Sequence, residues 1–143
     1  MATQITGCIL TPDGWIGGTL DFAERISAID GTRIPAPGAG EARVLPGFID
    51  LHVHGGGGAD VMDGNGAIDT VARIHARHGT TSLLATTMTA PREDIEKALA
   101  DVGRAMRERP ANSARVLGVH LEGPFINPGR RGAQPSAVRS GSI

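Results

Sequence analysis

The hydrophobic pattern of the chain changes near residue 44. Before that point, apolar residues occur in short runs separated by turn residues, which is typical of β-structure. The segments predicted to be strands are residues 4–10, 15–22 and 25–29. Asp30-Gly31 and residues 35–40 have the composition of turns and loops. Three short strands are too few for an independent sandwich, so we expect this segment to need a partner sheet.

From Val44 onward, apolar runs alternate with segments whose apolar residues have helical spacing. The predicted elements are strands over residues 44–53, 80–87 and 115–121 and helices over residues 66–78 and 92–109. The first strand is nearly continuously apolar, which predicts burial on both faces. Gly79 ends the first helix, and Pro110 follows the second. The order β-α-β-α-β predicts a parallel sheet.

Two architectures accept this order, an open doubly wound sheet and a (β/α)₈ barrel. A barrel of this kind takes typically about 250 residues, and no internal repeat makes up the difference. If the fold is such a barrel, this chain holds less than half of it, with three strands and two helices after Val44. The predicted domains are an N-terminal β segment over residues 1–43 and an α/β segment over residues 44–143.

The composition narrows the classes of partner. The 14 basic and 15 acidic residues nearly balance, which indicates neither a nucleic-acid nor a strongly anionic partner. Cys8 is the single cysteine, so no internal disulfide forms and a reducing compartment fits best. The N-terminus lacks a targeting pattern, and no apolar stretch approaches the roughly 20 residues that span a bilayer. We expect a cytoplasmic protein with no membrane partner.

Candidate metal ligands occur where predicted strands end. His52 and His54 lie two residues apart, so in an extended strand both imidazoles project from the same face. Glu122 follows the third predicted strand, and parallel strands have their carboxyl ends at one edge of the sheet. A zinc or iron ion on these residues would activate water for hydrolysis. By itself His-x-His is a weak pattern, and ordinary polar residues at a strand end are the alternative.

Two further features lie beside these residues. Gly55–Gly58 lack side chains, so their amides could approach a substrate or anion closely, or the segment could be a flexible loop. His120 lies two residues before Glu122 and shares its predicted face. It could be a further ligand or an outer hydrogen-bond partner, although a histidine satisfied by the backbone is the commoner case.

Two other pairs carry weaker signals. His75 and His78 are one helical turn apart, a spacing that can chelate a metal, but an outer helix favours surface or packing roles. Arg130 and Arg131 follow the Glu122 segment and could meet a phosphate. Solvated loop charge is the commoner fate of such an arginine pair.

Several segments resemble a known family. Residues 45–54, Leu-Pro-Gly-Phe-Ile-Asp-Leu-His-Val-His, resemble the first barrel strand of the amidohydrolase superfamily, which includes dihydroorotases and hydantoinases. Residues 54–63 and 120–127 are similar to the N-acetylglucosamine-6-phosphate deacetylase family. Residues 80–87 also resemble the second strand of that family. The resemblance covers the chain from about residue 44 to residue 135, and the His-Leu-Glu-Gly-Pro motif at residues 120–124 is specific.

The resemblance implies an α/β fold in which residues 44–143 are the truncated start of a (β/α)₈ TIM-type barrel, represented by its first three strands. It also implies that residues 1–43 are part of a small β-domain built from both chain ends. It implies metal-dependent hydrolysis of the acetamide of N-acetylglucosamine 6-phosphate, giving glucosamine 6-phosphate and acetate. The implied cofactor is one or two divalent ions, and the partner is a small amino-sugar phosphate. Glu122 maps to a metal ligand, and His52 and His54 map to a second metal that some members hold. Full-length members are expected to be homo-oligomers.

The resemblance also defines what this chain lacks. Ala133 and Gln134 align with the Ala-His pair that contacts the sugar in the family, and glutamine hydrogen-bonds but does not titrate near neutrality. Two histidine ligands, the phosphate-binding residues and the catalytic aspartate come later in the family. We therefore expect no general acid or base within the chain, and no activity of the chain alone.

Two alternatives to the deacetylase remain. One is another amidohydrolase that acts on a cyclic amide, although such relatives more often bridge their metals with a carboxylated lysine than with a glutamate like Glu122. The other is a non-catalytic truncated remnant. An unclosed barrel exposes strand edges, which favours aggregation.

Overall fold

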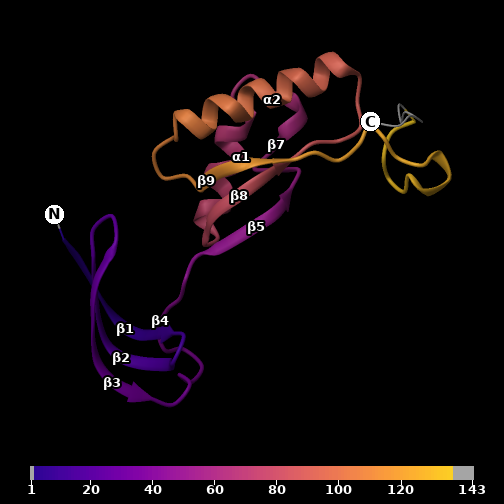
Figure 1. The fold of residues 1–143 in the computed structure, drawn as a ribbon. Coiled ribbons are helices and arrows are strands. Elements are labelled where there is room, and N and C mark those ends of the chain that lie inside the picture. The colour runs from indigo at the N-terminus through magenta and orange to yellow at the C-terminus, as the bar shows by residue number, and fades with distance from the viewer. Residues whose placement is uncertain (1, 137–143) are drawn as a thin grey trace. The chain divides into compact units, whose positions relative to one another are not determined.

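The computed structural model describes residues 2–136. The chain divides into two compact units, Met1–Pro46 and Gly47–Ile143, and each contains its own sheet (Figure 1). The expected mixed α/β class is confirmed. Neither helix in the described residues is long and apolar enough to cross a membrane.

The first unit is a four-stranded sheet. Its strands are β1 (Thr3–Thr11), β2 (Gly14–Phe22), β3 (Ile26–Ile34) and β4 (Arg43–Val44). The spatial order is β3-β2-β1-β4, with antiparallel pairs except for the parallel pair of β1 and β4. Ile9 and Leu20 are its buried apolar residues.

The turn predicted at Asp30-Gly31 is wrong, because β3 continues through both residues. The reason is a close approach between strands. Gly31 pairs with Gly18, and a Cβ at Gly18 would lie only 1.9 Å from the carbonyl oxygen of Asp30. The glycine pair lets two strands pass with less separation than side chains allow.

The second unit is a parallel sheet covered by two helices. Its strands β5 (Phe48–Val53), β8 (Thr80–Thr86) and β9 (Arg115–His120) alternate with α1 (Ala67–Arg77) and α2 (Arg92–Arg107). The strands lie in the order β5-β8-β9, and the hairpin of β6 (Gly55–Gly56) and β7 (Ala59–Asp60) follows β5. Two short 3₁₀ helices are η1 (Val61–Asp63) and η2 (Pro128–Arg130).

One hydrophobic core joins the helices and the strands. Its buried members include Val53, Leu83, Ala85 and Val116 from the strands and Ile68, Val71, Ala72, Ala98, Val102 and Ala105 from the helices. Because both helices contribute to one cluster, they cover the same face of the sheet (Figure 1). This packing leaves the carboxyl ends of the three strands side by side.

The prediction of a strand over residues 44–53 that is buried on both faces is wrong. Val44 belongs to β4 of the first unit, and β5 begins at Phe48. Phe48, Ile49 and Leu51 are 61–64% exposed, and only Val53 reaches the core. Within the described residues β5 pairs with β8 alone, so it is an edge strand and its apolar side chains have no covering layer.

A buried carboxylate fixes the start of α1. The N-cap residue of α1, Gly66, offers no side-chain cap, and Asp101 of α2 accepts the amide of Ile68 at 3.3 Å instead. Arg104 donates to Asp101 at 2.9 Å and to Asp69 of α1 at 2.7 Å. These hydrogen bonds, to Asp69 first and Asp101 second, raise the pKa of the Arg104 guanidinium above its ordinary value. These hydrogen bonds link α1 to α2.

Candidate metal centre

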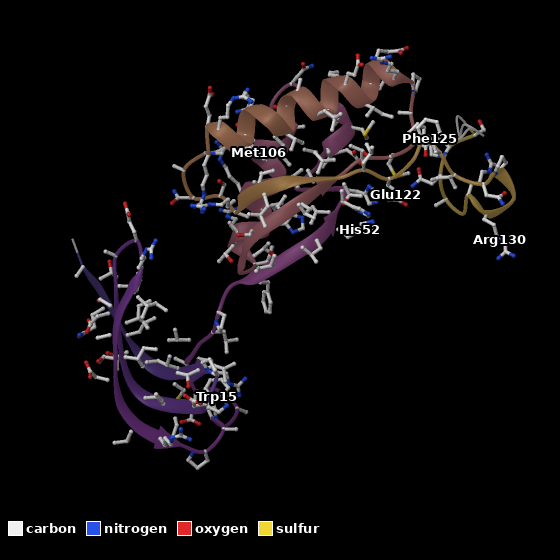
Figure 2. The ribbon with its side chains drawn as sticks, in the orientation of Figure 1. Trp15, His52, Met106, Glu122, Phe125 and Arg130 are labelled. Carbon is white, nitrogen blue, oxygen red and sulfur yellow. The ribbon has the colours of Figure 1, made fainter. Side chains whose placement is uncertain are left out.

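Three side chains converge at the carboxyl edge of the parallel sheet. His52 lies on β5, His54 follows its last residue, and Glu122 lies two residues beyond the end of β9. Figure 2 shows the His52 and Glu122 side chains beside each other at this edge. Among residues 2–136, these three form the one cluster of His, Cys, Asp or Glu side chains that could hold a metal ion.

The distances between the ligand atoms suit a metal ion. The Nε2 atoms of His52 and His54 lie 3.0 Å apart, and Glu122 Oε2 lies 3.1 Å from His54 Nε2 and 3.5 Å from His52 Nε2. Ligands bound to zinc at about 2.0–2.1 Å in a tetrahedron are separated by roughly 3.3 Å. Three ligands also leave a fourth position open, as in catalytic zinc sites.

The hydrogen bonding supports the same assignment. Glu122 Oε2 is a buried atom that has no hydrogen-bond partner among the described residues, although it faces both imidazoles. A buried carboxylate oxygen without a partner is costly unless an ion or a donor satisfies it. His54 Nδ1 is also buried and unpaired within residues 2–136, so the outer partner that ligating histidines usually have is not supplied there.

His120 lies next to the ligands but does not join the cluster. Its ring contacts the ring of His52 in an edge-on arrangement, with centroids 4.8 Å apart. Its Nδ1 atom lies 3.4 Å from the Thr86 hydroxyl. Among the roles predicted for His120, that of an outer partner of the ligands therefore fits this geometry best.

The glycine run after His54 forms a packed hairpin. Gly57 and Gly58 have φ angles of 65° and 82°, the positive values that a type I′ hairpin turn requires. A Cβ at Gly55 would lie 2.5 Å from the carbonyl oxygen of Ala59, and one at Gly56 would lie 2.8 Å from Ile74. The hairpin places Val61 so that its amide donates to the His54 carbonyl at 2.7 Å.

The two residues expected to contact a sugar lie in different surroundings. Ala133 is exposed, whereas Gln134 is buried. The Gln134 amide oxygen accepts the backbone amide of Thr89 at 2.8 Å, and its nitrogen lies 3.6 Å from the Met88 sulfur. Gln134 thus ties its own segment to the loop after β8, and its contact with a sugar stays a prediction.

The weaker candidates lie outside the cluster. His75 Nε2 is 3.1 Å from the Gly55 carbonyl oxygen, so it packs α1 against the hairpin, and His78 is exposed. These positions favour the surface and packing interpretation. Arg130 and Arg131 are both exposed, and Figure 2 shows Arg130 apart from His52 and Glu122.

Sequence reasoning missed the two threonines that hold the ligand segments. Thr86 Oγ1 accepts the amide of Val53 at 2.9 Å, and Thr87 Oγ1 accepts the amide of Glu122 at 3.3 Å. Both threonines are fully buried. The available signal was a Thr-Thr pair at the end of an apolar strand, which is an unusual place to bury two hydroxyl groups.

The chain is similar to proteins of a known family. The model of the amidohydrolase family matches residues 43–142. The N-acetylglucosamine-6-phosphate deacetylase of Bacillus subtilis (strain 168) is 46% identical over 95 residues, covering 64% of this chain and 24% of that protein. The N-acetylgalactosamine-6-phosphate deacetylase of Escherichia coli O157:H7 is 38% identical over 130 residues, covering 89% and 34%.

The chain is also similar in fold to solved structures. N-acetylglucosamine-6-phosphate deacetylase from Thermotoga maritima matches with a TM-score of 0.79 and 29% identity, over 98% of this chain and 38% of that one. A variant of the Mycobacterium smegmatis enzyme, in complex with N-acetyl-D-glucosamine-6-phosphate, matches with a TM-score of 0.73 and 29% identity, over 99% and 38%.

The chain spans about a quarter to a third of the length of these curated relatives, which are 24% and 34% covered. The family match nevertheless includes both strands that carry the candidate ligands and the whole parallel sheet. The metal-compatible cluster at the carboxyl edge of that sheet lies within the matched residues. On this match, the chain belongs to the amidohydrolase family.

Proposed function

We propose that the chain is part of a metal-dependent deacetylase that hydrolyses the acetamide of N-acetylglucosamine 6-phosphate to glucosamine 6-phosphate and acetate. The observation that carries the proposal is the convergence of His52, His54 and Glu122, whose ligand atoms lie 3.0–3.5 Å apart. The substrate follows from the names of the relatives that the chain matches.

We propose that β5, β8 and β9 are the first three strands of a (β/α)₈ barrel, and that residues 1–43 belong to a small β-domain. The strand order follows the chain order, and both helices cover one face of the sheet. An open doubly wound sheet carries helices on both faces. The matches to solved deacetylases support the same architecture.

Imidazole nitrogens and a carboxylate suit zinc or iron, and His52, His54 and Glu122 would hold one such ion. When bound, a divalent ion supplies a Lewis acid that activates water and polarises a carbonyl. Glu122 brings the only negative charge of the three ligands. The Val61 amide and the Thr86 hydroxyl group hydrogen-bond the backbone at His54 and Val53 and so orient the histidines, and the exposed Ala133 is accessible to a sugar.

A second candidate substrate is N-acetylgalactosamine 6-phosphate. The relative from Escherichia coli O157:H7 carries that name and matches 89% of this chain. The two sugars share the acetamide and the phosphate and differ at one hydroxyl group. The same metal centre would serve both reactions, so the residues that contact the sugar ring decide between them.

A chimera tests the function directly. This chain would replace the matching N-terminal segment of the Bacillus subtilis enzyme, which is 46% identical over 95 residues. We expect the chimera to release acetate from N-acetylglucosamine 6-phosphate, and we expect a chelator to abolish the release. The chain alone should release none. The native Bacillus subtilis enzyme is the positive control, and the galactosamine isomer measures selectivity.

Two outcomes would contradict the proposal. A folded, metal-loaded chimera that is inert towards both sugar phosphates but opens a hydantoin ring would favour the cyclic-amide alternative. Acetate release by the isolated chain would overturn the expectation that its catalytic set is incomplete.

A further inference from the structure

The central strand of the parallel sheet ends in two buried threonines. Thr86 and Thr87 are both 0% exposed. Their strand, β8, lies between β5, which leads into the two histidines, and β9, which leads into Glu122. Burying a hydroxyl group costs free energy unless it is hydrogen-bonded, so the partners of these two groups indicate their role.

Thr86 replaces a missing backbone contact at the histidine pair. The register between β5 and β8 shifts between Asp50 and Val53, so the regular ladder is interrupted just before the end of β5. The Val53 amide, which lies between His52 and His54 in the chain, donates to Thr86 Oγ1 at 2.9 Å. The orientation of both imidazoles follows from the backbone at this residue.

The same hydroxyl group reaches the outside of the ligand set. Thr86 Oγ1 lies 3.4 Å from His120 Nδ1, and a hydroxyl group can accept one hydrogen bond while donating another. The ring of His120 packs edge-on against the ring of His52. Thr86 is therefore linked to the histidine pair in two ways, through the backbone amide of Val53 and through the ring of His120.

Thr87 holds the carboxylate ligand in a parallel way. Its Oγ1 atom accepts the Glu122 amide at 3.3 Å, and its own amide donates to the His120 carbonyl at 3.1 Å. These two hydrogen bonds lie at the start and at the end of the turn that leads from β9 to Glu122. A shift of this turn would move the carboxylate away from the two Nε2 atoms.

We infer that Thr86 and Thr87 form a hydroxyl clamp, a pair of positioning residues at the end of β8 that keeps His52, His54 and Glu122 in metal-binding geometry. The inference rests on the proposed metal centre. Metal sites require their ligands to be held within about 0.5 Å, and loss of an outer hydrogen bond typically weakens metal binding roughly 10- to 100-fold.

Cobalt(II) binding to the 143-residue chain tests the clamp, because the visible spectrum of cobalt reports its coordination. The variants are Thr86→Val and Thr87→Val, which remove the hydroxyl group at nearly constant volume, and Thr86→Ser and Thr87→Ser, which keep it. Thr89→Val is the matched control, because Thr89 is 1% exposed and its hydroxyl group has no partner among the described residues.

We expect each valine variant to bind cobalt roughly 10- to 100-fold more weakly and to show a changed spectrum. The serine variants and Thr89→Val should bind as the unaltered chain does. A Thr86→Val chain that is folded by circular dichroism and binds cobalt with unchanged affinity and spectrum would overturn the inference. If a valine variant does not fold, the Ser and Ala variants at the same position provide the comparison, since they differ in the hydroxyl group alone.

Hydrogen exchange separates the clamp from the proposed metal centre. In the chain without metal, the amides of Val53 and Glu122 should exchange faster in Thr86→Val and Thr87→Val respectively. Unchanged exchange at both amides would refute the clamp whatever the metal data show. A chain that binds no cobalt but has the expected exchange pattern would retain the two hydrogen bonds of the clamp and show that His52, His54 and Glu122 do not hold a metal by themselves.

Discussion

Glu122 contributes most of the electrostatic attraction in the candidate centre. It faces both imidazoles through one oxygen atom, at 3.1 and 3.5 Å, and its side chain is 30% exposed. His52 is the more open ligand, because 54% of its side chain is exposed. A charged ligand in a partly enclosed position holds a divalent ion more strongly than a neutral ligand that water reaches freely. We therefore expect the three ligands to contribute unequally.

Glu122→Gln should lower the affinity for zinc or cobalt by at least about 10-fold, because it removes the negative charge while keeping the shape. His52→Gln should lower it less. Competition with a chromogenic chelator measures both affinities. Glu96→Gln, at an exposed glutamate on α2, is the control and should bind metal normally. Equal affinities for Glu122→Gln and the unaltered chain would show that the cluster is not a metal site.

At the scale of elements, α1 depends on a residue of α2. Asp101 is 7% exposed and accepts the Ile68 amide in place of a local N-cap. Asp101→Ala should lower the free energy of unfolding by about 1–3 kcal/mol, because it leaves a buried amide and Arg104 without their partner. Urea unfolding measures the change.

Two controls accompany the Asp101 variant. Glu96→Ala removes an exposed ion pair with Arg92, so it should lower the free energy of unfolding much less than Asp101→Ala does. Asp101→Asn keeps an acceptor but removes the charge, and it should fall between the two. A change for Asp101→Ala no larger than that for Glu96→Ala would mean that the cap contributes nothing.

The hairpin after His54 depends on the backbone conformation of its turn. Gly58 has a φ of 82°, and a Cβ there would meet no atom within 4 Å, so only the backbone resists substitution. Gly58→Val should therefore destabilise the chain by about 1–2 kcal/mol, whereas Gly58→Asn should be better tolerated. Urea unfolding of the two variants measures the difference, and equal stabilities would argue against the positive-φ turn.

At the scale of the whole molecule, the most exposed apolar surface of the parallel sheet lies on β5. Ile49 and Leu51 are 64% and 61% exposed on a strand that pairs on one side only within residues 2–136. Such an edge is a template for association with another chain. We expect the isolated chain to form larger species as its concentration rises, and size-exclusion chromatography with light scattering measures them.

Substitution tests whether β5 causes this association. The double variant Ile49→Lys, Leu51→Lys should shift the chain towards the monomer, because charge on an edge strand opposes pairing. Met106→Lys, at an apolar residue of α2 that is 50% exposed, should not. A monomer at every concentration, without any substitution, would contradict the prediction.

Much of the second unit was predictable because its signals are local. The strand at Thr80–Thr86 is a β-branched and apolar run just after Gly79, and the helix at Arg92–Arg107 lies between two prolines. The start of β5 was not predictable, because Val44 is as apolar as the residues of β5 that follow it. Val44 instead pairs with Ile9 of β1, a residue far away in the chain.

The sequence by itself determined the residue types of the centre and the order of the elements that carry them. Periodicity and turn residues act over a few positions, and parallel strands necessarily bring their carboxyl ends together, so the meeting of His52, His54 and Glu122 followed from the chain. Only the tertiary structure decided which groups hold those ligands. Hydrogen bonds such as those of Thr86 to Val53 and Thr87 to Glu122 join residues more than 30 positions apart, and no local pattern specifies such partners.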